Sequence, residues 1–245
     1  MSELRAVDIA EIPIWDKVTE LGDLKYEEVR WAIPRVLPRA ATVLVAAAYA
    51  SYKSWMALDW AIAVASGTEW AGLDIAEPLP VLYLDRENGM SMVAERRDML
   101  MGLRPLKRRM TYWGEWVNLP VPNIGSDIMK EWASLYNGLI IFDTLTRFHR
   151  SKENDNMAMA RVMEPFKDLA RCGATVVILH HRGKSSEAEF RGAEDIVGAV
   201  DVAYSLVRDE DSRHQVTLKQ IKNRFAPESS QSLVLINGVF QRAVT

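Results

Sequence analysis

The sequence predicts an α/β fold, with a mostly parallel sheet covered by helices on both faces and an antiparallel extension at the C-terminal end. Three observations support this fold class. Short, continuous apolar runs recur between residues 42 and 179, and segments with helical spacing separate them. Strands that are buried on both faces read as continuous apolar runs, so this arrangement indicates a parallel sheet. From about Val202 onward, apolar and polar residues alternate, as in antiparallel strands.

Four buried strands and three helices are predicted in order along the chain. The strands cover residues 42–46, 81–84, 139–142 and 175–179, and the helices cover residues 54–66, 90–101 and 157–171. Gly67 ends the first helix, and Pro165 is expected to bend the third. In open parallel sheets, ligands bind beyond the carboxyl ends of the strands. The residues that follow each apolar run are therefore the ones to inspect for chemistry.

Length, charge and cysteine usage narrow the class of protein. We expect a lead-in over residues 1–40, where Pro34 and Pro38 favour an extended path, and one domain over residues 41–245. The net charge of −3 argues against a protein that coats nucleic acid through a cationic surface, but allows a few cations inside a channel. A single cysteine, Cys172, precludes an intrachain disulfide, and no uncharged apolar run approaches a membrane span. We therefore expect a cytoplasmic protein with no membrane association.

The first strand runs into a loop that matches part of a phosphate-binding pattern. A P-loop reads G-x-x-x-x-G-K-[ST] between a strand and a helix, and here Ala47 and Tyr52 replace both glycines. Lys53 can reach the β- and γ-phosphates of ATP, and Ser54 can ligate Mg²⁺. The alternative is an ordinary strand–turn–helix with an incidental Lys-Ser pair. The candidate nucleotide-binding residues are Ala47, Ala48, Tyr49, Ala50, Ser51, Tyr52, Lys53, Ser54 and Trp55.

The missing glycines affect the expected activity. Glycine allows positive φ and lets backbone N–H groups approach phosphate closely. A Cβ at Ala47, Ala50 or Tyr52 could distort the loop, at a cost of roughly 1–3 kcal/mol per strained residue. The sequence therefore predicts ATP and Mg²⁺ as ligands and leaves open whether the loop supports hydrolysis.

Polar residues follow the other strands. Asp143 comes directly after the run LIIF, where a carboxylate can order the water shell of Mg²⁺; the alternative is a simple strand exit. Asp85 and Glu87 follow the second strand, and either could polarise the attacking water, or both could belong to an exposed turn. His180 follows the fourth strand and is our candidate sensor of the γ-phosphate, with a buried core histidine as the alternative.

Together these residues resemble the RecA-like ATPases of the replicative-helicase branch, in particular plasmid RepA and DnaB-type hexameric helicases and their phage relatives. The likeness covers roughly residues 30–225 and is most specific in DTLTRFH (143–149), VILHH (177–181) and the later Arg191-Gly192. The resemblance implies a RecA-like P-loop NTPase core. It also implies that Lys53 and Ser54 form the Walker-A pair, that Asp143 is the Walker-B acid, that Glu87 is the catalytic base and that His180 is the sensor.

The resemblance further implies a homo-oligomeric ring, typically a hexamer, in which a neighbouring subunit supplies positive charge to the γ-phosphate. Lys222 and Arg224 look like the Lys-x-Arg finger of this family, with Arg191 and Arg86 as rivals. The alternative for both residues is solvated charge at a strand end.

Two loops are expected to face single-stranded DNA, over residues 147–156 and 182–195. The candidate phosphate contacts are Arg147, Arg150, Lys152, Arg182, Lys184 and Arg191, and Phe148 or Phe190 could stack on bases. The alternative is an ordinary loop with a solvated mixture of charges. The function implied is an ATP-driven helicase for phage or plasmid replication, with replication or recombination proteins as possible partners. The alternatives are a recombination or annealing mediator that uses ATP as a switch, and a degenerate P-loop subunit without hydrolysis.

Overall fold

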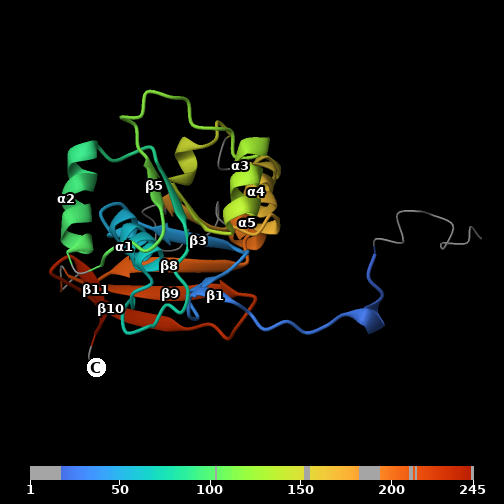
Figure 1. The fold of residues 1–245 in the computed structure, drawn as a ribbon, viewed down its shortest axis with the longest axis horizontal. Coiled ribbons are helices and arrows are strands. Elements are labelled where there is room, and N and C mark those ends of the chain that lie inside the picture. Colours follow the sequence, from blue (N-terminus) through green and yellow to red (C-terminus); the bar gives the residue numbers. More distant parts are fainter. Residues whose placement is uncertain are drawn as a thin grey trace, which may run out of the picture.

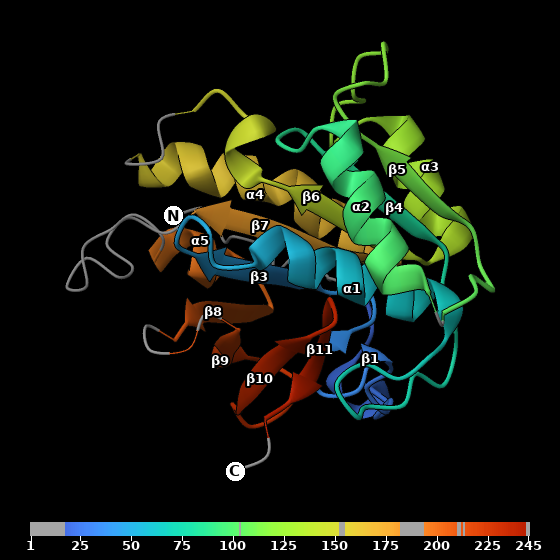
Figure 2. The ribbon, with the colours of Figure 1, turned by 90° about the vertical axis from the view of Figure 1, so that its left-hand side faces the viewer.

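The computed structural model describes residues 18–102, 104–151, 155–181, 194–209, 212 and 214–243. Its centre is a nine-stranded sheet with the order β11-β10-β9-β8-β3-β7-β6-β4-β5, and helices cover both faces (Figures 1 and 2). The six strands from β8 to β5 are parallel, and β9, β10 and β11 are antiparallel. The strands of this sheet are β3 (Thr42–Ala47), β4 (Val81–Asp85), β5 (Met110–Trp113), β6 (Leu139–Asp143), β7 (Thr175–His181), β8 (Val202–Arg208), β9 (Gln215–Asn223), β10 (Ser230–Ile236) and β11 (Val239–Arg242).

The four apolar runs form the four buried strands predicted from the sequence, β3, β4, β6 and β7. The predicted helices are α1 (Lys53–Ser66), α2 (Met90–Met101) and α4 (Asn156–Arg171), and Pro165 lies inside α4. Three further elements were not predicted: β5, α3 (Asp127–Tyr136) and α5 (Glu194–Ala199). The sheet and its antiparallel C-terminal strands confirm the predicted α/β class.

One strand of the C-terminal region differs from the expectation. The alternating region was predicted to be antiparallel from about Val202, but β8 runs parallel to β3, with Val43 opposite Val202. The antiparallel part begins only at β9. The burial of β8 explains this difference, because its first five residues are buried beside the central strand β3 and belong to the core.

Each parallel strand separates two cores. Alternate side chains of a strand point to opposite faces. In β6, Leu139 and Ile141 pack toward α1, whereas Ile140 and Phe142 pack with residues of α3 and α4. Figure 1 shows α1 and α2 on one side of the sheet and α3, α4 and α5 on the other. Side chains that continue the Leu139 and Ile141 series therefore lie on the face that carries α1.

The N-terminal region is divided differently from the predicted boundary at residue 40. Residues 18–28 are exposed, and the chain here extends away from the body of the molecule (Figure 1). It includes the short 3₁₀ helix η3 (Leu21–Asp23). The strands β1 (Trp31–Ile33) and β2 (Leu37–Pro38), by contrast, form a small antiparallel pair whose apolar residues join the core on the α1 face. Residues 31–38 are thus part of the packed domain. Within the described part of the chain, no helix is both long and apolar enough to cross a membrane.

Candidate nucleotide-binding site

The carboxyl ends of four neighbouring strands bring the predicted site residues to one edge of the sheet. Ala47 at the end of β3 pairs with His181 at the end of β7, and Asp85 at the end of β4 pairs with Asp143 at the end of β6. The strand β7 lies between β3 and β6. Because all four strands are parallel, their polar end residues meet beside the N-terminus of α1 (Figure 2).

A cavity of about 480 Å³ lies at this edge. The loop that leaves β3 and enters α1 forms one wall, and Trp55 belongs to the same wall because its Nε1 donates a hydrogen bond to the Gly238 carbonyl at 2.7 Å. The remaining lining residues are Lys53, Ser54, Glu87, Asn88, Arg96, His181 and Arg208. The structure therefore brings the candidate loop together with Lys53, Ser54 and Glu87 around an open volume.

The loop takes left-handed backbone conformations without glycine. Tyr52, at the second glycine position of the P-loop pattern and the N-cap of α1, has φ 65° and ψ 15°, and Ala50 has φ 58°. Ser51 Oγ donates to the Ala48 carbonyl at 2.5 Å. The Arg208 guanidinium donates to the Ala50 carbonyl at 3.3 Å and lies 5.5 Å from the centre of the Tyr52 ring. These contacts hold the loop in a shape that L-residues adopt only at a cost.

Lys53 lies at the floor of the cavity, with 6% of its surface exposed. Burial lowers the pKa of Lys53, and the negative charges of Asp143, Glu87 and Asp85 oppose this shift. The ammonium group thus faces carboxylates on β6 and at the end of β4.

Asp143 has two chemically different oxygens. Oδ2 accepts a hydrogen bond from the Tyr83 hydroxyl at 2.9 Å, and the Ser54 hydroxyl also donates to the carboxylate. Oδ1 is buried and has no hydrogen-bond partner among the described residues. Burial raises the pKa of Asp143 to about 6 in spite of the nearby Lys53. A buried, unsatisfied carboxylate oxygen next to a serine hydroxyl fits the oxygen donors that Mg²⁺ prefers, so the residues present suit this ion.

The structure separates the two acidic candidates that follow β4. Asp85 is fully buried, and its Oδ1 accepts the backbone N–H groups of Glu87 and Asn88 at 2.8 and 3.0 Å. Its Oδ2 accepts the Asn88 side-chain amide at 2.9 Å and the Tyr112 hydroxyl. Asp85 therefore fixes the turn after β4, and Glu87 is the carboxylate that lines the cavity.

Glu87 is surrounded by three polar partners. Thr144 Oγ1 donates to Glu87 Oε1 at 2.7 Å, His181 Nε2 lies 3.3 Å from both carboxylate oxygens, and Arg147 Nε lies 3.6 Å from Oε1. Burial raises the pKa of Glu87, but the hydrogen bonds from Thr144 and His181 and the charges of His181 and Lys53 outweigh it, so the pKa falls below its ordinary value. Glu87 is thus an ionised carboxylate at neutral pH.

The histidine beside Glu87 is His181, not the predicted His180. His180 is buried, and burial lowers its pKa to about 4, so it is neutral at physiological pH. The His181 ring stacks on Tyr49 with ring centres 4.1 Å apart and lines the cavity. The cause is the alternation of side chains along β7: Val177 and Leu179 point to the α1 face, and His181 continues this series. The same alternation in the sequence could have identified His181.

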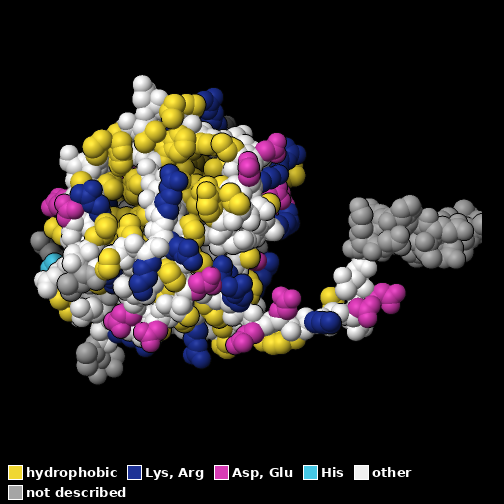
Figure 3. Space-filling view, in the orientation of Figure 1, with side chains coloured by type: hydrophobic (Ala, Val, Ile, Leu, Met, Phe, Trp, Pro, Cys, Tyr) yellow, Lys and Arg dark blue, Asp and Glu magenta, His cyan; other side chains and the backbone are white. Residues whose placement is uncertain are grey.

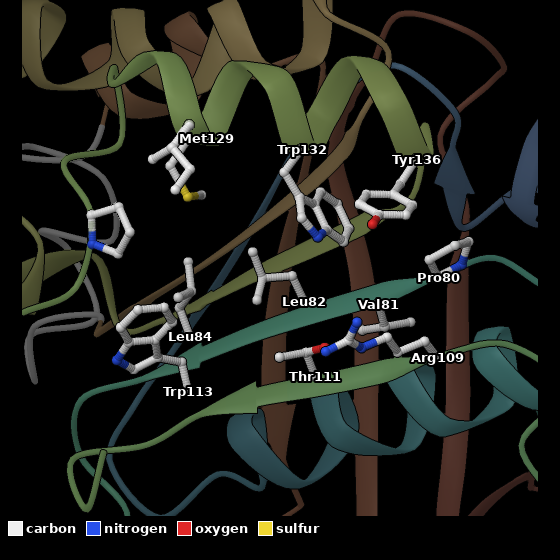
Figure 4. Close-up of a pocket in the computed structure, with 12 residues that line it drawn as sticks. Pro80, Val81, Leu82, Leu84, Arg109, Thr111, Trp113, Met129, Trp132 and Tyr136 are labelled. Atoms are coloured by element: carbon white, nitrogen blue, oxygen red, sulfur yellow. The ribbon is translucent and has the colours of Figure 1, made fainter. Parts of the chain in front are cut away.

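A second pocket, of about 260 Å³, lies between α3 and the strands β4 and β5 (Figure 4). Leu82, Trp113, Met129 and Trp132 point into it, and no carboxylate or histidine is found among the described residues that line it. Figure 3 shows hydrophobic side chains gathered on the surface of this region. The carboxylates and the ammonium group converge only at the first cavity of the two.

Comparisons with known proteins agree with this geometry. A family model described as an AAA domain matches residues 14–187. The chain belongs to this AAA domain family. A solved structure of an ATPase domain is similar to the AAA domain with a TM-score of 0.62 and 15% sequence identity, covering 84% of this chain and 85% of that one.

A second solved structure, titled "The Structure Of A DnaB-Like Replicative Helicase And Its Interactions With Primase", has a TM-score of 0.66 and 15% identity, and the match covers 98% of this chain and 67% of the other. These likenesses confirm the predicted RecA-like fold and the resemblance to the DnaB branch.

The finger candidates of the AAA domain lie at the other edge of its sheet. Lys222 pairs with Ala203 near the start of β8, whereas the loop follows the end of β3, opposite Leu206. Lys222 Nζ donates to the carbonyls of Val197 and Gly198 at 2.9 and 2.8 Å, and Arg224 forms an ion pair with Asp201 at 3.0 Å with its side chain 57% exposed. Neither residue lies at the cavity of its own chain. The rival Arg86 has a buried Nε without a partner among the described residues.

The DNA-contact candidates of the AAA domain are only partly described. Arg147 ends the 3₁₀ helix η4 (Leu145–Arg147), Arg150 is exposed, and both belong to the segment that follows β6 at the nucleotide edge. Phe148 packs edge-on against Phe142, with ring centres 5.1 Å apart, so it forms part of the core. Lys152, Arg182, Lys184, Phe190 and Arg191 lie outside the described residues.

Proposed function

We propose that this AAA domain is the ATP-hydrolysing motor of a ring-forming replicative helicase of phage or plasmid type that acts on single-stranded DNA. The observation that carries the proposal is the convergence of Lys53, Ser54, Asp143 and Glu87 on one cavity at the carboxyl edge of the sheet. Chemistry that needs an ammonium group, a metal carboxylate and a second carboxylate at a helix N-terminus is phosphoryl transfer from a nucleoside triphosphate.

The residues have separable roles in this proposal. The loop N–H groups and Lys53 hold the β- and γ-phosphates, and Ser54 and Asp143 hold the metal. When bound, Mg²⁺ neutralises charge that develops on the phosphates. Glu87 orients and polarises the attacking water as an ionised carboxylate. His181, which touches Glu87 and faces the cavity, takes the sensor role that the sequence analysis gave to His180.

The remaining parts of the proposal concern neighbours. Arg224 lies at the sheet edge opposite the cavity and is half exposed, which suits a finger that completes the site of the next subunit in a ring. Lys222 is held by the last carbonyls of α5 and is the weaker candidate. Arg147 and Arg150 follow β6, so a strand bound by them would lie close to the carboxyl edge of the sheet.

The test of the proposal is phosphate release from ATP with and without single-stranded DNA. We predict that Lys53→Ala lowers the DNA-stimulated rate to background, because the variant loses the only cation of the described residues that is buried on the cavity floor. Lys219→Ala, which removes an exposed lysine from β9, is the matched control and should keep the wild-type rate. Wild-type hydrolysis by Lys53→Ala would contradict the assigned site, and no nucleotide binding at millimolar ATP would point to a degenerate subunit.

One observation favours a second function. The left-handed residues Ala50 and Tyr52 make the loop costly to form, and a slow ATPase would suit a recombination or annealing mediator that uses ATP as a switch. Unwinding of a forked duplex by the purified protein separates the two. A helicase separates the strands in an ATP-dependent manner, whereas a mediator pairs or anneals strands and leaves the fork intact.

A further inference from the structure

A tyrosine inside the sheet contacts the candidate metal carboxylate. Tyr83 lies in the middle of β4 and is 1% exposed. Its hydroxyl donates to Asp143 Oδ2 on the neighbouring strand β6 at 2.9 Å. Tyr83 pairs with Ile141 in the parallel register, so the hydroxyl reaches along β6 to the residue at the strand end. The contact is therefore built into the pairing of two central strands.

Neighbouring aromatic rings hold the Tyr83 ring in place. Tyr83 stacks on Tyr112 of β5 with ring centres 4.7 Å apart, and Tyr112 stacks on Trp116 at 5.5 Å, with angles of 10° and 7° between the planes. The Tyr112 hydroxyl bonds to Asp85. Burial and the charge of Asp143 raise the pKa of Tyr83 well above its ordinary value, so the hydroxyl keeps its proton and acts as a donor. The ring cannot turn away without breaking the stack.

This donor makes the two oxygens of Asp143 unequal. Oδ2 is occupied by Tyr83, whereas Oδ1 is buried without a partner among the described residues. A monodentate carboxylate presents one oxygen reliably only if the other is held, since the side chain otherwise rotates about its last bond. Ser54 also donates to Asp143, but its hydroxyl belongs to the loop–helix junction that must accommodate the nucleotide.

We propose that Tyr83 is a positioning residue for Mg²⁺·ATP: its hydroxyl fixes Asp143 Oδ2 so that Oδ1 faces the divalent ion. The inference rests on the proposed function and extends it to a residue of the strand interior. Partners that orient a metal-binding carboxylate change metal affinity more than they change the reaction itself. The effect should therefore appear in the Mg²⁺ requirement.

The test is a Mg²⁺ titration of the binding of a fluorescent, non-hydrolysable ATP analogue to full-length Tyr83→Phe and wild type. The variant keeps the aromatic stack and loses only the hydroxyl. We expect the Mg²⁺ concentration for half-saturation to rise about tenfold. Nucleotide binding in EDTA should remain as in wild type, and saturating Mg²⁺ should restore most of the ATPase rate.

Tyr112→Phe is the matched control, because it removes the same hydroxyl from the next ring of the stack, where the partner is Asp85. Its Mg²⁺ half-saturation should stay within about twofold of wild type. An unmoved Mg²⁺ requirement in Tyr83→Phe, or equal shifts in both variants, would overturn the inference while leaving the proposed function intact. No Mg²⁺-dependent binding by wild type would overturn both. Thermal unfolding of both variants should match wild type to within a few degrees.

Discussion

Two residues of the nucleotide loop, Ala50 and Tyr52, occupy backbone conformations that favour glycine. Each left-handed residue costs roughly 1–2 kcal/mol relative to glycine, because its Cβ crowds the following carbonyl. The ring of Tyr52 packs against the α1-side core and lies under the Arg208 guanidinium, so its side chain offsets part of this cost. Ala50 has only a methyl group with which to compensate. The loop thus replaces glycine by contacts at one position and by strain at the other.

We therefore predict that Ala50→Gly stabilises the protein. Relief of the left-handed penalty exceeds the extra entropy that glycine brings to the unfolded chain, so a gain of about 0.5–1 kcal/mol is expected. For a domain of this size, the Tm should rise by about 2 °C. Ala160→Gly in the exposed middle of α4 is the control, because the same change at a helical residue should lower the Tm by a similar amount. A lower Tm in Ala50→Gly would show that the loop is not strained there.

Single residues of the site were predictable from sequence where a polar group follows an apolar strand. Lys53, Ser54, Asp143 and Glu87 stand at such positions, and all four lie at the cavity edge. The choice between Asp85 and Glu87 was not predictable, because the two share a face of an extended chain and only the turn shows which one is used by backbone donors. Tyr83 was read as an apolar strand residue, since nothing in VLYL indicates that its hydroxyl meets a carboxylate from another strand.

The helix α1 positions Lys53 and Ser54, and a buried carboxylate ties this element to the rest of the molecule. Asp59 is fully buried in α1. It accepts hydrogen bonds from Trp70 Nε1 at 3.0 Å and from the Phe240 backbone N–H at 3.2 Å, and it pairs with Arg104. Burial raises the pKa of Asp59, although Arg104 opposes the shift. One side chain thus joins α1 to the segment after it, to the region after α2 and to β11.

Asp59→Ala should destabilise the protein strongly. The variant leaves the Arg104 guanidinium, 11% exposed, without its carboxylate and leaves two N–H donors unpaired. Removal of one partner of a buried ion pair costs about 3–5 kcal/mol, so the Tm should fall by roughly 10 °C. Glu164→Ala removes a carboxylate from an exposed ion-pair cluster on α4 and should leave the Tm nearly unchanged. A small effect of Asp59→Ala, or failure of Asp59→Leu with Arg104→Met to recover part of the loss, would contradict this explanation.

Elements were predictable to the degree that burial is uniform along them. The strands β3, β4, β6 and β7 are buried on both faces and therefore read as apolar runs. The edge strand β5 is only partly buried in all four residues, which leaves no clear period in its sequence. The direction of β8 depends on its pairing with β3, a long-range contact that alternation cannot encode. The C-terminal strands were predicted correctly where one face is solvated.

At the scale of the whole molecule, the chemistry is divided between two edges of the sheet. The cavity follows the ends of β3, β4, β6 and β7, and Arg224 lies beyond β9 near the opposite ends of the strands. A head-to-tail arrangement of identical subunits closes into a ring when its rotation permits, and it brings unlike surfaces of neighbours together. Such an arrangement would place Arg224 of one subunit at the cavity of the next, where a single chain leaves the site without its finger.

This arrangement predicts complementation between two inactive variants. Lys53→Ala subunits keep the finger but lose the phosphate-binding lysine, and Arg224→Ala subunits keep the site but lose the finger. If the finger acts on a neighbour, an equal mixture forms about a quarter of its interfaces with both parts intact, and DNA-stimulated phosphate release returns in proportion. If Arg224 acts within its own chain, or only through its ion pair with Asp201, the mixture stays as inactive as its components. Light scattering of the mixture verifies assembly, and Arg242→Ala, which removes an exposed arginine from β11, should be active alone and in every mixture.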